Sequence, residues 1–137
     1  MTAERQAFPA RTDVLPTVNA FVERRCADLG VGRATTLLLQ LMAEELFINT
    51  VVHGFGNDAR RRVSLAVRDC GAEVELVAED NARAFNPFDG APAAAPTPDS
   101  VGGYGRLLLM GLSSRQAYER RGPCNRVTVY VPKNRPK

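Results

Sequence analysis

Glu45 and Asn49 are the residues whose types and spacing most clearly suggest chemistry in this sequence. They lie four positions apart in a stretch, from Arg33 to His53, that contains neither proline nor glycine and is predicted to be one helix. At about 100° per residue, their side chains lie roughly 40° apart around the helix axis. The flanking positions are apolar: Leu38, Leu41, Met42 and Val52. A carboxylate and an amide are therefore expected inside the apolar face of the helix, where burial is costly without a polar partner.

Two interpretations of this pair remain open from spacing alone. The side chains either meet a polar ligand, or they satisfy neighbouring backbone groups and each other. Asp80 poses a similar choice, because it ends a predicted strand and enters an irregular segment. It is either a turn-forming aspartate or an acceptor for the amino group of a ligand at the end of the strand.

Glycines before a short apolar helix are the third feature with possible chemistry. Gly102, Gly103 and Gly105 precede a predicted helix from Arg106 to Leu112. Glycines at a helix start free backbone N–H groups that can hold a phosphate. A flexible hinge explains them equally well, because neither a P-loop nor a strand-linked dinucleotide fingerprint is present.

The remaining patterns predict the elements that position these residues. Hydrophobic periodicity and turn residues give the following order: a strand at Arg5–Ala10, a helix from Thr12 or Asp13 to Gly30, the helix Arg33–His53, a hairpin of strands at Arg62–Arg68 and Glu73–Ala78, an irregular segment Asp80–Ser100, the helix Arg106–Leu112, and strands at Gln116–Arg120 and Arg126–Val131. The helix beginning at Thr12 or Asp13 would be capped by that residue, with Pro16 in its first turn. This order predicts an α+β fold: a two-layer α/β sandwich with a mostly antiparallel mixed sheet and helices on one face.

Length and composition limit the classes of protein that fit. The 137 residues suit a single domain, and 45% apolar with 24% charged residues is typical of a soluble protein. No run of apolar residues was long enough to predict a membrane span, and no signal peptide is apparent, so a cytosolic protein is expected. Three dispersed cysteines without a C-x-x-C pair favour neither a disulfide framework nor a zinc site. A single histidine argues against a Ser-His-Asp triad and a multi-histidine metal site.

Surface charge gives little support to nucleic-acid binding. The formal net charge is only +3, and the densest basic cluster, Arg60–Arg62, lies between a predicted helix and a strand. A solvated turn is favoured over a phosphate or nucleic-acid patch.

Phe47 and Val51 lie on the helix face opposite Glu45, where they form either a homodimer contact or a contact with the first helix.

In combination and order, these motifs resemble the Bergerat-fold ATPases, the histidine-kinase-like ATP-binding (GHKL) superfamily. Glu45-x-x-x-Asn49 with His53-Gly54, then Asp80 with Phe85-Asn86-Pro87, then Gly102-Gly103-Tyr104-Gly105 resemble its N, G1 and G2 boxes. The nearest branch is the small bacterial anti-sigma factors that act as serine-protein kinases. The ending, Tyr118 to Thr128, is also similar to that branch, and the resemblance extends from about Phe8 to Pro132.

The resemblance implies a role for each matching residue. Glu45 matches the general base that polarises a substrate serine hydroxyl, and Asn49 matches the ligand that ties Mg²⁺ to the phosphates of ATP. Asp80 matches the residue that recognises the adenine amino group, and Phe85 belongs to the same box. The phosphate cradle would comprise Gly103, Tyr104, Gly105 and Arg106. Residues from Asp89 to about 101 would form a lid over ATP, in keeping with their Pro/Ala/Asp composition.

Three positions depart from the family pattern or leave alternatives. Ala82 stands where the family has a glycine, and its methyl group would crowd the adenine or restrict the backbone. Arg106 stands where an apolar residue is common, and it contacts a phosphate or points to solvent. His53 is either a structural residue at the helix end or a phosphate contact.

The favoured function is an ATP- and Mg²⁺-dependent anti-sigma factor that phosphorylates a serine of a STAS-domain antagonist. Its partners would be a sigma factor and that antagonist, and phosphorylation would break the competing complex by adding charge at an interface. The alternative is a non-catalytic protein-binding module on the same fold, with weak or no ATP binding. An acyl-coenzyme A transferase is disfavoured, because its glycine pattern is not met and the pair on the helix would be unexplained.

Overall fold

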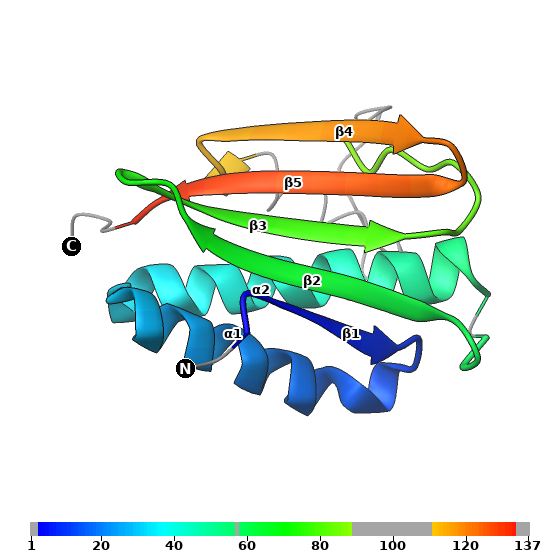
Figure 1. The fold of residues 1–137 in the computed structure, drawn as a ribbon, viewed down its shortest axis with the longest axis horizontal. Coiled ribbons are helices and arrows are strands. Elements are labelled where there is room, and N and C mark those ends of the chain that lie inside the picture. Colours follow the sequence, from blue (N-terminus) through cyan, green and yellow to red (C-terminus); the bar gives the residue numbers. More distant parts are fainter. Residues whose placement is uncertain (1–2, 57, 89–110, 134–137) are drawn as a thin grey trace.

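A five-stranded antiparallel sheet carries two helices on one face (Figure 1). The computed structural model describes residues 3–56, 58–88 and 111–133. In chain order its elements are β1 (Arg5–Pro9), the 3-10 turn η1 (Thr12–Val14), α1 (Leu15–Leu29), α2 (Arg33–Asn49), the π-helical turn η2 (Thr50–Gly54), β2 (Arg62–Asp69), β3 (Glu73–Asp80), β4 (Arg115–Arg121) and β5 (Cys124–Pro132). The predicted α+β class, with its antiparallel sheet and helices on one face, is confirmed.

Helix α1 ends as its sequence predicts but begins differently. Gly30 follows it in the left-handed region, with φ of 71°, and closes the helix with hydrogen bonds from its backbone N–H. Pro16 lies in the first turn, where its missing N–H costs nothing. The prediction that Thr12 or Asp13 caps α1 is wrong, because both residues are used in η1 and the cap position falls to Val14.

The long second helix changes its geometry at its C-terminal end. Regular α-helix stops at Asn49, and the chain continues as a π-helical turn to Gly54. A π turn widens the helix by one residue and is often found at functional sites. The predicted helix to His53 is therefore continuous but not uniform, and the change places Thr50 beside the end of β3, as described below.

Strand order in the sheet is β1-β2-β3-β5-β4 (Figure 1). The predicted hairpin is found, because β2 pairs with β3. The last two strands, β4 and β5, also pair, around a turn in which Gly122 has φ of 54°. Strand β5 inserts between β3 and β4, and its register sets Asn125 directly opposite Asp80. This pairing brings the end of β3 and the start of β5 to one edge of the site.

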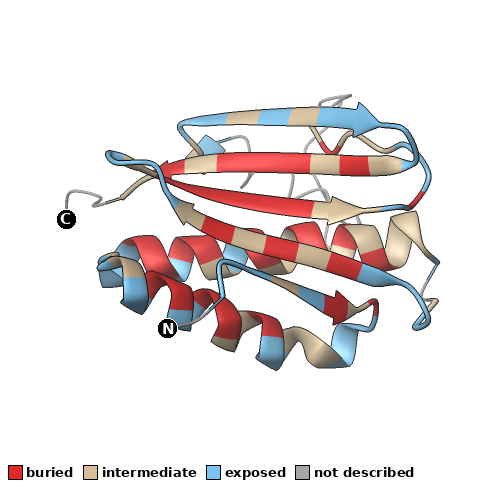
Figure 2. Cartoon of the chain, viewed as in Figure 1, coloured by how far each residue is buried: buried red, intermediate tan, exposed pale blue. Residues whose placement is uncertain are grey.

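The core lies between the sheet and the two helices. Buried positions alternate along β2, and the helices turn their buried residues toward the sheet (Figure 2). Three fully buried rings tie the layers together, with Phe8 of β1 edge-on to Phe21 of α1 at 5.7 Å and to Phe47 of α2 at 6.3 Å between centroids. Phe47 and Val51 are both fully buried, so of the two alternatives for these residues, packing within the fold is the one found.

Burial also explains why α2 resembles a membrane span. The segment Arg33–Gly54 is long and apolar enough to cross a bilayer by length and composition, contrary to the sequence prediction. More than half of its most apolar window, 56%, is buried inside the fold, as in the core helix of a soluble domain.

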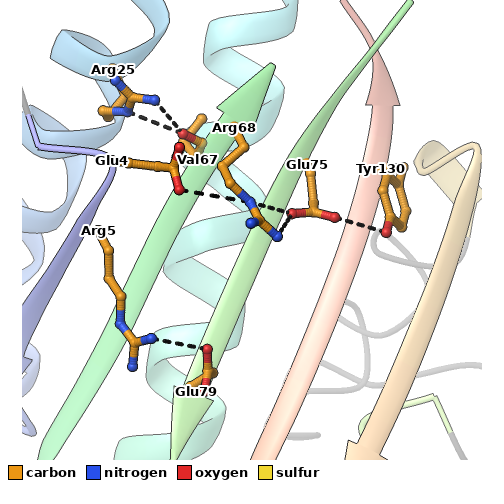
Figure 3. Close-up of polar contacts among 8 residues, drawn as sticks. All are labelled: Glu4, Arg5, Arg25, Val67, Arg68, Glu75, Glu79 and Tyr130. Carbon is orange, nitrogen blue, oxygen red and sulfur yellow. Dashed lines mark hydrogen bonds and ion pairs between the residues drawn. The ribbon is translucent and has the colours of Figure 1, made fainter. Parts of the chain in front are cut away.

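The face of the sheet that the helices do not cover is polar and carries several ion pairs (Figure 3). Arg68 of β2 lies between Glu4 and Glu75, and the Glu75 carboxylate also accepts a hydrogen bond of 2.8 Å from Tyr130. Arg5 of β1 pairs with Glu79 of β3 at 3.2 Å. An antiparallel sheet can turn such a polar face to solvent, without a second helical layer.

Candidate functional site

A pocket lies where the C-terminal part of α2, η2, the end of β3 and the start of β5 meet. Its lining includes Asn49, Thr50, Asp80, Ala82, Phe85 and Asn125. The fold therefore brings together three of the predicted site residues, Asn49, Asp80 and Phe85, which are far apart in the sequence. Glu45 lies one helical turn before Asn49 and is not part of the lining.

Asn49 carries an unsatisfied polar group into this pocket. The residue is only 4% exposed, and its Nδ2 atom has no hydrogen-bond partner among the described residues. A buried polar group without a partner costs about 1–3 kcal/mol. The oxygen and nitrogen of an amide exchange places by a half rotation, so either atom can face the pocket. An amide oxygen is a suitable ligand for Mg²⁺, and the arrangement fits a partner that the protein itself does not supply.

Glu45 lies on the border between the core and solvent. It is half-buried, and Leu41, expected on the apolar face beside it, is 49% exposed. The expectation that both polar groups lie inside the apolar face thus holds for Asn49 but only in part for Glu45. Burial raises the pKa of the Glu45 carboxyl above its usual range, and the neighbouring Glu44 charge adds to the rise. A raised pKa makes the ionised carboxylate a stronger base.

Asp80 is held in place by three hydrogen bonds. Its Oδ2 accepts one from the Thr50 hydroxyl at 3.2 Å, and its Oδ1 accepts one from the Ala82 backbone N–H and one from Asn125 Nδ2, both at 2.9 Å. The hydrogen bond to Ala82 is that of an Asx turn. Thus Asp80 is both a turn-former and a pocket residue, and its carboxylate remains an acceptor with a fixed orientation.

Asn125 is the site residue that the sequence analysis did not single out. It is 3% exposed, and besides Asp80 its Nδ2 donates to the Arg83 carbonyl at 2.9 Å. Its Oδ1 accepts hydrogen bonds from the Phe85 N–H and the Tyr118 hydroxyl. One side chain on β5 therefore fixes both the carboxylate and the loop after β3. Asn125 lies within the segment Tyr118 to Thr128 that resembles the family branch, but the resemblance assigned it no role, and a spacing pattern does not reveal such a cross-strand contact.

The loop after β3 is packed against η2. A Cβ built on Gly54 would lie 2.9 Å from the Ala82 Cβ, so the two backbones approach closely, and the Ala82 methyl group occupies the space that Gly54 leaves. Arg120 donates to the Ala82 carbonyl at 2.7 Å. The His53 ring stacks on Phe85 at 6.4 Å between centroids, which favours a structural role for this histidine.

Space in the pocket is limited in this conformation. The pocket is partly open to solvent, and its free volume is about 20 Å³, room for about one water molecule. A larger ligand therefore enters only if side chains that line the pocket move aside.

Several predicted site residues fall outside the described residues. These are Gly103, Tyr104, Gly105 and Arg106 of the predicted phosphate cradle, together with the predicted lid from Asp89 to about residue 101 and most of the predicted helix Arg106–Leu112. Within residues 3–56, 58–88 and 111–133, no group of three or more His, Cys, Asp and Glu side chains is placed to hold a metal.

Solved structures with this fold include proteins from two bacteria. The RsbU and RsbW domains of Rv1364c from Mycobacterium tuberculosis match 98% of this chain with a TM-score of 0.63 and 14% identity. The Erythrobacter litoralis EL346 blue-light activated histidine kinase matches 85% with a TM-score of 0.58, and its histidine kinase domain matches 92% with 0.55, both at 18% identity. This chain spans 35%, 42% and 62% of those three chains, respectively. At these identities the likeness establishes the fold.

The sequence itself matches a family model. A search of curated proteins finds no match. The model of the family described as histidine kinase-like ATPase domain matches residues 8–131, nearly the whole chain. That range contains the helix with Glu45 and Asn49 and the strand end with Asp80. This chain therefore belongs to the histidine kinase-like ATPase domain family.

Proposed function

We propose that this protein is an ATP-binding anti-sigma factor with serine-protein kinase activity. Its substrate would be a serine of a STAS-domain antagonist, and a sigma factor would be the competing partner. The observation that carries the proposal is the buried Asn49 amide, whose Nδ2 atom has no hydrogen-bond partner among the described residues, in a pocket that the fixed Asp80 carboxylate also lines. Family membership supports a kinase- or ATPase-type regulatory activity with ATP as ligand. Similarity to a structure containing an RsbW domain is consistent with the anti-sigma branch.

Each described site residue has a task in this function. Asp80 would accept a hydrogen bond from the adenine amino group, with its orientation fixed by Thr50 and Asn125. Asn49 would hold Mg²⁺ through its amide oxygen. When bound, ATP supplies the γ-phosphoryl group, and Mg²⁺ neutralises charge on its phosphates. Glu45 would accept the proton of the substrate serine hydroxyl, a task for which its raised pKa is suited.

Transfer of radiolabelled γ-phosphate from ATP to purified STAS-domain proteins tests the proposal. The parent chain should label a serine of one such protein, and Glu45→Gln should lose at least about a hundredfold in rate, the usual contribution of a positioned base. Glu119→Gln, an exposed carboxylate on β4, is the matched control and should label the substrate at the parent rate. Labelling by Glu45→Gln at the parent rate, or no labelling by the parent, would refute the kinase assignment.

A non-catalytic protein-binding module is the second candidate. The small free volume of the pocket favours it, since an adenine base fits only if the side chains that line the pocket move. This candidate predicts neither heat nor thermal stabilisation on addition of ATP and Mg²⁺, whereas a bound ligand stabilises the folded state by mass action. Calorimetric titration therefore separates the two functions.

A further inference from the structure

Two large apolar residues of α2, Leu37 and Leu41, are exposed. Leu37 is 46% and Leu41 is 49% exposed, and they are the only large exposed hydrophobic residues in the part of the chain that the structure describes. Four positions apart on a helix, their side chains are neighbours on one face. They line a shallow groove of about 420 Å³ beside α1. Apolar side chains that gather at a groove indicate an interaction site.

The groove lies where α1 meets α2. Asn19 of α1 lines it together with residues of α2. The Asn19 backbone carbonyl accepts a hydrogen bond of 3.1 Å from Gln40 Nε2, which links the two helices at this groove. Glu44 is the charged residue of the lining, so the groove combines an apolar contact with a negative charge.

The groove leads along the helix toward the proposed base. Leu37, Leu41 and Glu44 repeat at steps of four and three residues, so they form one exposed stripe. Glu45 follows Glu44 directly and lies on the border of the same stripe. At about 1.5 Å of rise per residue, Leu41 is about 6 Å from Glu45 along the helix axis. A protein segment seated on the leucines would therefore place its neighbouring residues beside Glu45.

We propose that this groove, defined by Asn19, Leu37, Gln40, Leu41 and Glu44, docks the protein substrate of the kinase. The inference rests on the proposed function, because the distance to Glu45 is what identifies the occupant as a phosphate acceptor. The docking segment presents an apolar side chain to the leucines and a basic side chain to Glu44. Complementarity with an exposed apolar pair and an acidic residue favours a lysine- or arginine-bearing apolar segment.

The size of the patch favours a transient substrate over a second copy of this chain. Two half-exposed leucines supply only a small part of the roughly 800 Å² that each partner buries in a stable interface. A kinase must release its product, and a small contact permits this. The leucines set the affinity for the substrate, and they leave the nucleotide pocket unaffected because neither of them lines it.

A peptide titration tests the docking surface without knowledge of the natural partner. The probe is a synthetic amphipathic helix of leucine and lysine about 14 residues long, about four turns, added to the full isotopically labelled chain. Backbone amide shifts should concentrate at residues 37–44 and at Asn19, and Leu37→Gln/Leu41→Gln should weaken binding about tenfold or more. Leu37→Met/Leu41→Met keeps the apolar surface and should bind as the parent does. Shifts elsewhere, no shifts, or equal binding by the glutamine variant would overturn the proposal.

Kinetics with a STAS-domain substrate separate docking from catalysis. The glutamine variant should raise KM about tenfold, with kcat and the affinity for ATP unchanged, and the methionine variant should restore KM. An unchanged KM in the glutamine variant would overturn the docking role. If the parent phosphorylates no STAS protein while the peptide still maps to the groove, the proposed kinase function fails and the docking surface stands. A parent mass in solution that falls from dimer to monomer in the glutamine variant would instead assign the groove to a second copy and refute the substrate as its occupant.

Discussion

At the scale of the single residue, the proposed base Glu45 carries a cost in stability. Its carboxyl is half-buried beside Glu44, and its pKa is raised in the folded state, chiefly by burial. Between the ordinary pKa near 4.5 and the raised value, the folded state binds more protons than the unfolded state. Stability therefore falls as pH rises through this window, and the cost is fully present above it. Enzymes commonly keep such unfavourable charges where chemistry needs them.

Glu45→Gln should therefore make the protein more stable while it abolishes phosphate transfer. The gain in free energy of unfolding at about pH 8 should be less than about 1 kcal/mol, because solvent screens a half-exposed carboxylate. Near pH 4, where both states are largely protonated, the difference between variant and parent should shrink toward zero. Urea denaturation at the two pH values measures both quantities. A variant that is less stable than the parent at pH 8 would contradict the assigned cost of the charge.

Asn125 should be the most sensitive polar residue of the described site. Asn125→Ala removes the donor to Asp80 and the acceptor of the Phe85 N–H, so a loss of about 2–3 kcal/mol in the free energy of unfolding is expected. Affinity for ATP should fall as well, because the Asp80 carboxylate loses its orientation. Tyr118→Phe removes only one of the hydrogen bonds to Asn125 and should cost about 1 kcal/mol.

Urea denaturation and calorimetric titration with ATP check the two expectations together. Circular dichroism of Asn125→Ala should remain that of the folded parent. If Asn125→Ala binds ATP as tightly as the parent while it is destabilised, Asn125 stabilises the fold without positioning the site.

At the scale of elements, the pocket is bordered by a close contact between η2 and the loop after β3. Gly54 closes the π-helical turn, and the Ala82 methyl group lies against it. The sequence predicted a long helix with its polar pair and a glycine after it, since periodicity reports the path of a helix. It did not predict the π turn, because a change of one residue in helical winding leaves the apolar pattern intact. Similarly, the effect of Ala82 could not be judged until its neighbour was known.

Substitution of Gly54 tests this contact. Gly54→Ala should destabilise the protein by about 1–3 kcal/mol, because the new Cβ would approach the Ala82 Cβ to within 2.9 Å. Ala82→Gly in the same chain should recover most of that loss, since it removes the obstructing methyl group. A double-mutant cycle from thermal unfolding measures the coupling. Strictly additive effects of the two substitutions would mean that the elements do not press on each other here.

At the scale of the whole molecule, the order of elements was the most predictable property. Alternation along the strands and Gly30 after α1 are local signals, and they correctly indicated strands and the end of a helix. The insertion of β5 between β3 and β4 is not local, and it alone places Asn125 opposite Asp80. Site residues on one helix were therefore predictable from spacing, whereas those joined by strand order required the structure.

The whole fold directs one amide and one carboxylate into a single pocket from elements that are distant in sequence. Two-layer packing buries Asn49 at the end of α2, and the polar outer face of the sheet leaves the helical side for the site (Figures 1 and 3). The proposed function therefore requires that the Asn49 amide binds Mg²⁺ together with ATP.

Isothermal titration with ATP, with and without Mg²⁺, tests this most directly when it is repeated for Asn49→Ala. The parent should bind ATP more tightly with Mg²⁺, and Asn49→Ala should lose about tenfold or more of that gain. Asn81→Ala, an exposed amide outside the pocket lining, is the control and should behave as the parent does. The same Mg²⁺ dependence in Asn49→Ala, or no binding of ATP by the parent, would contradict the account.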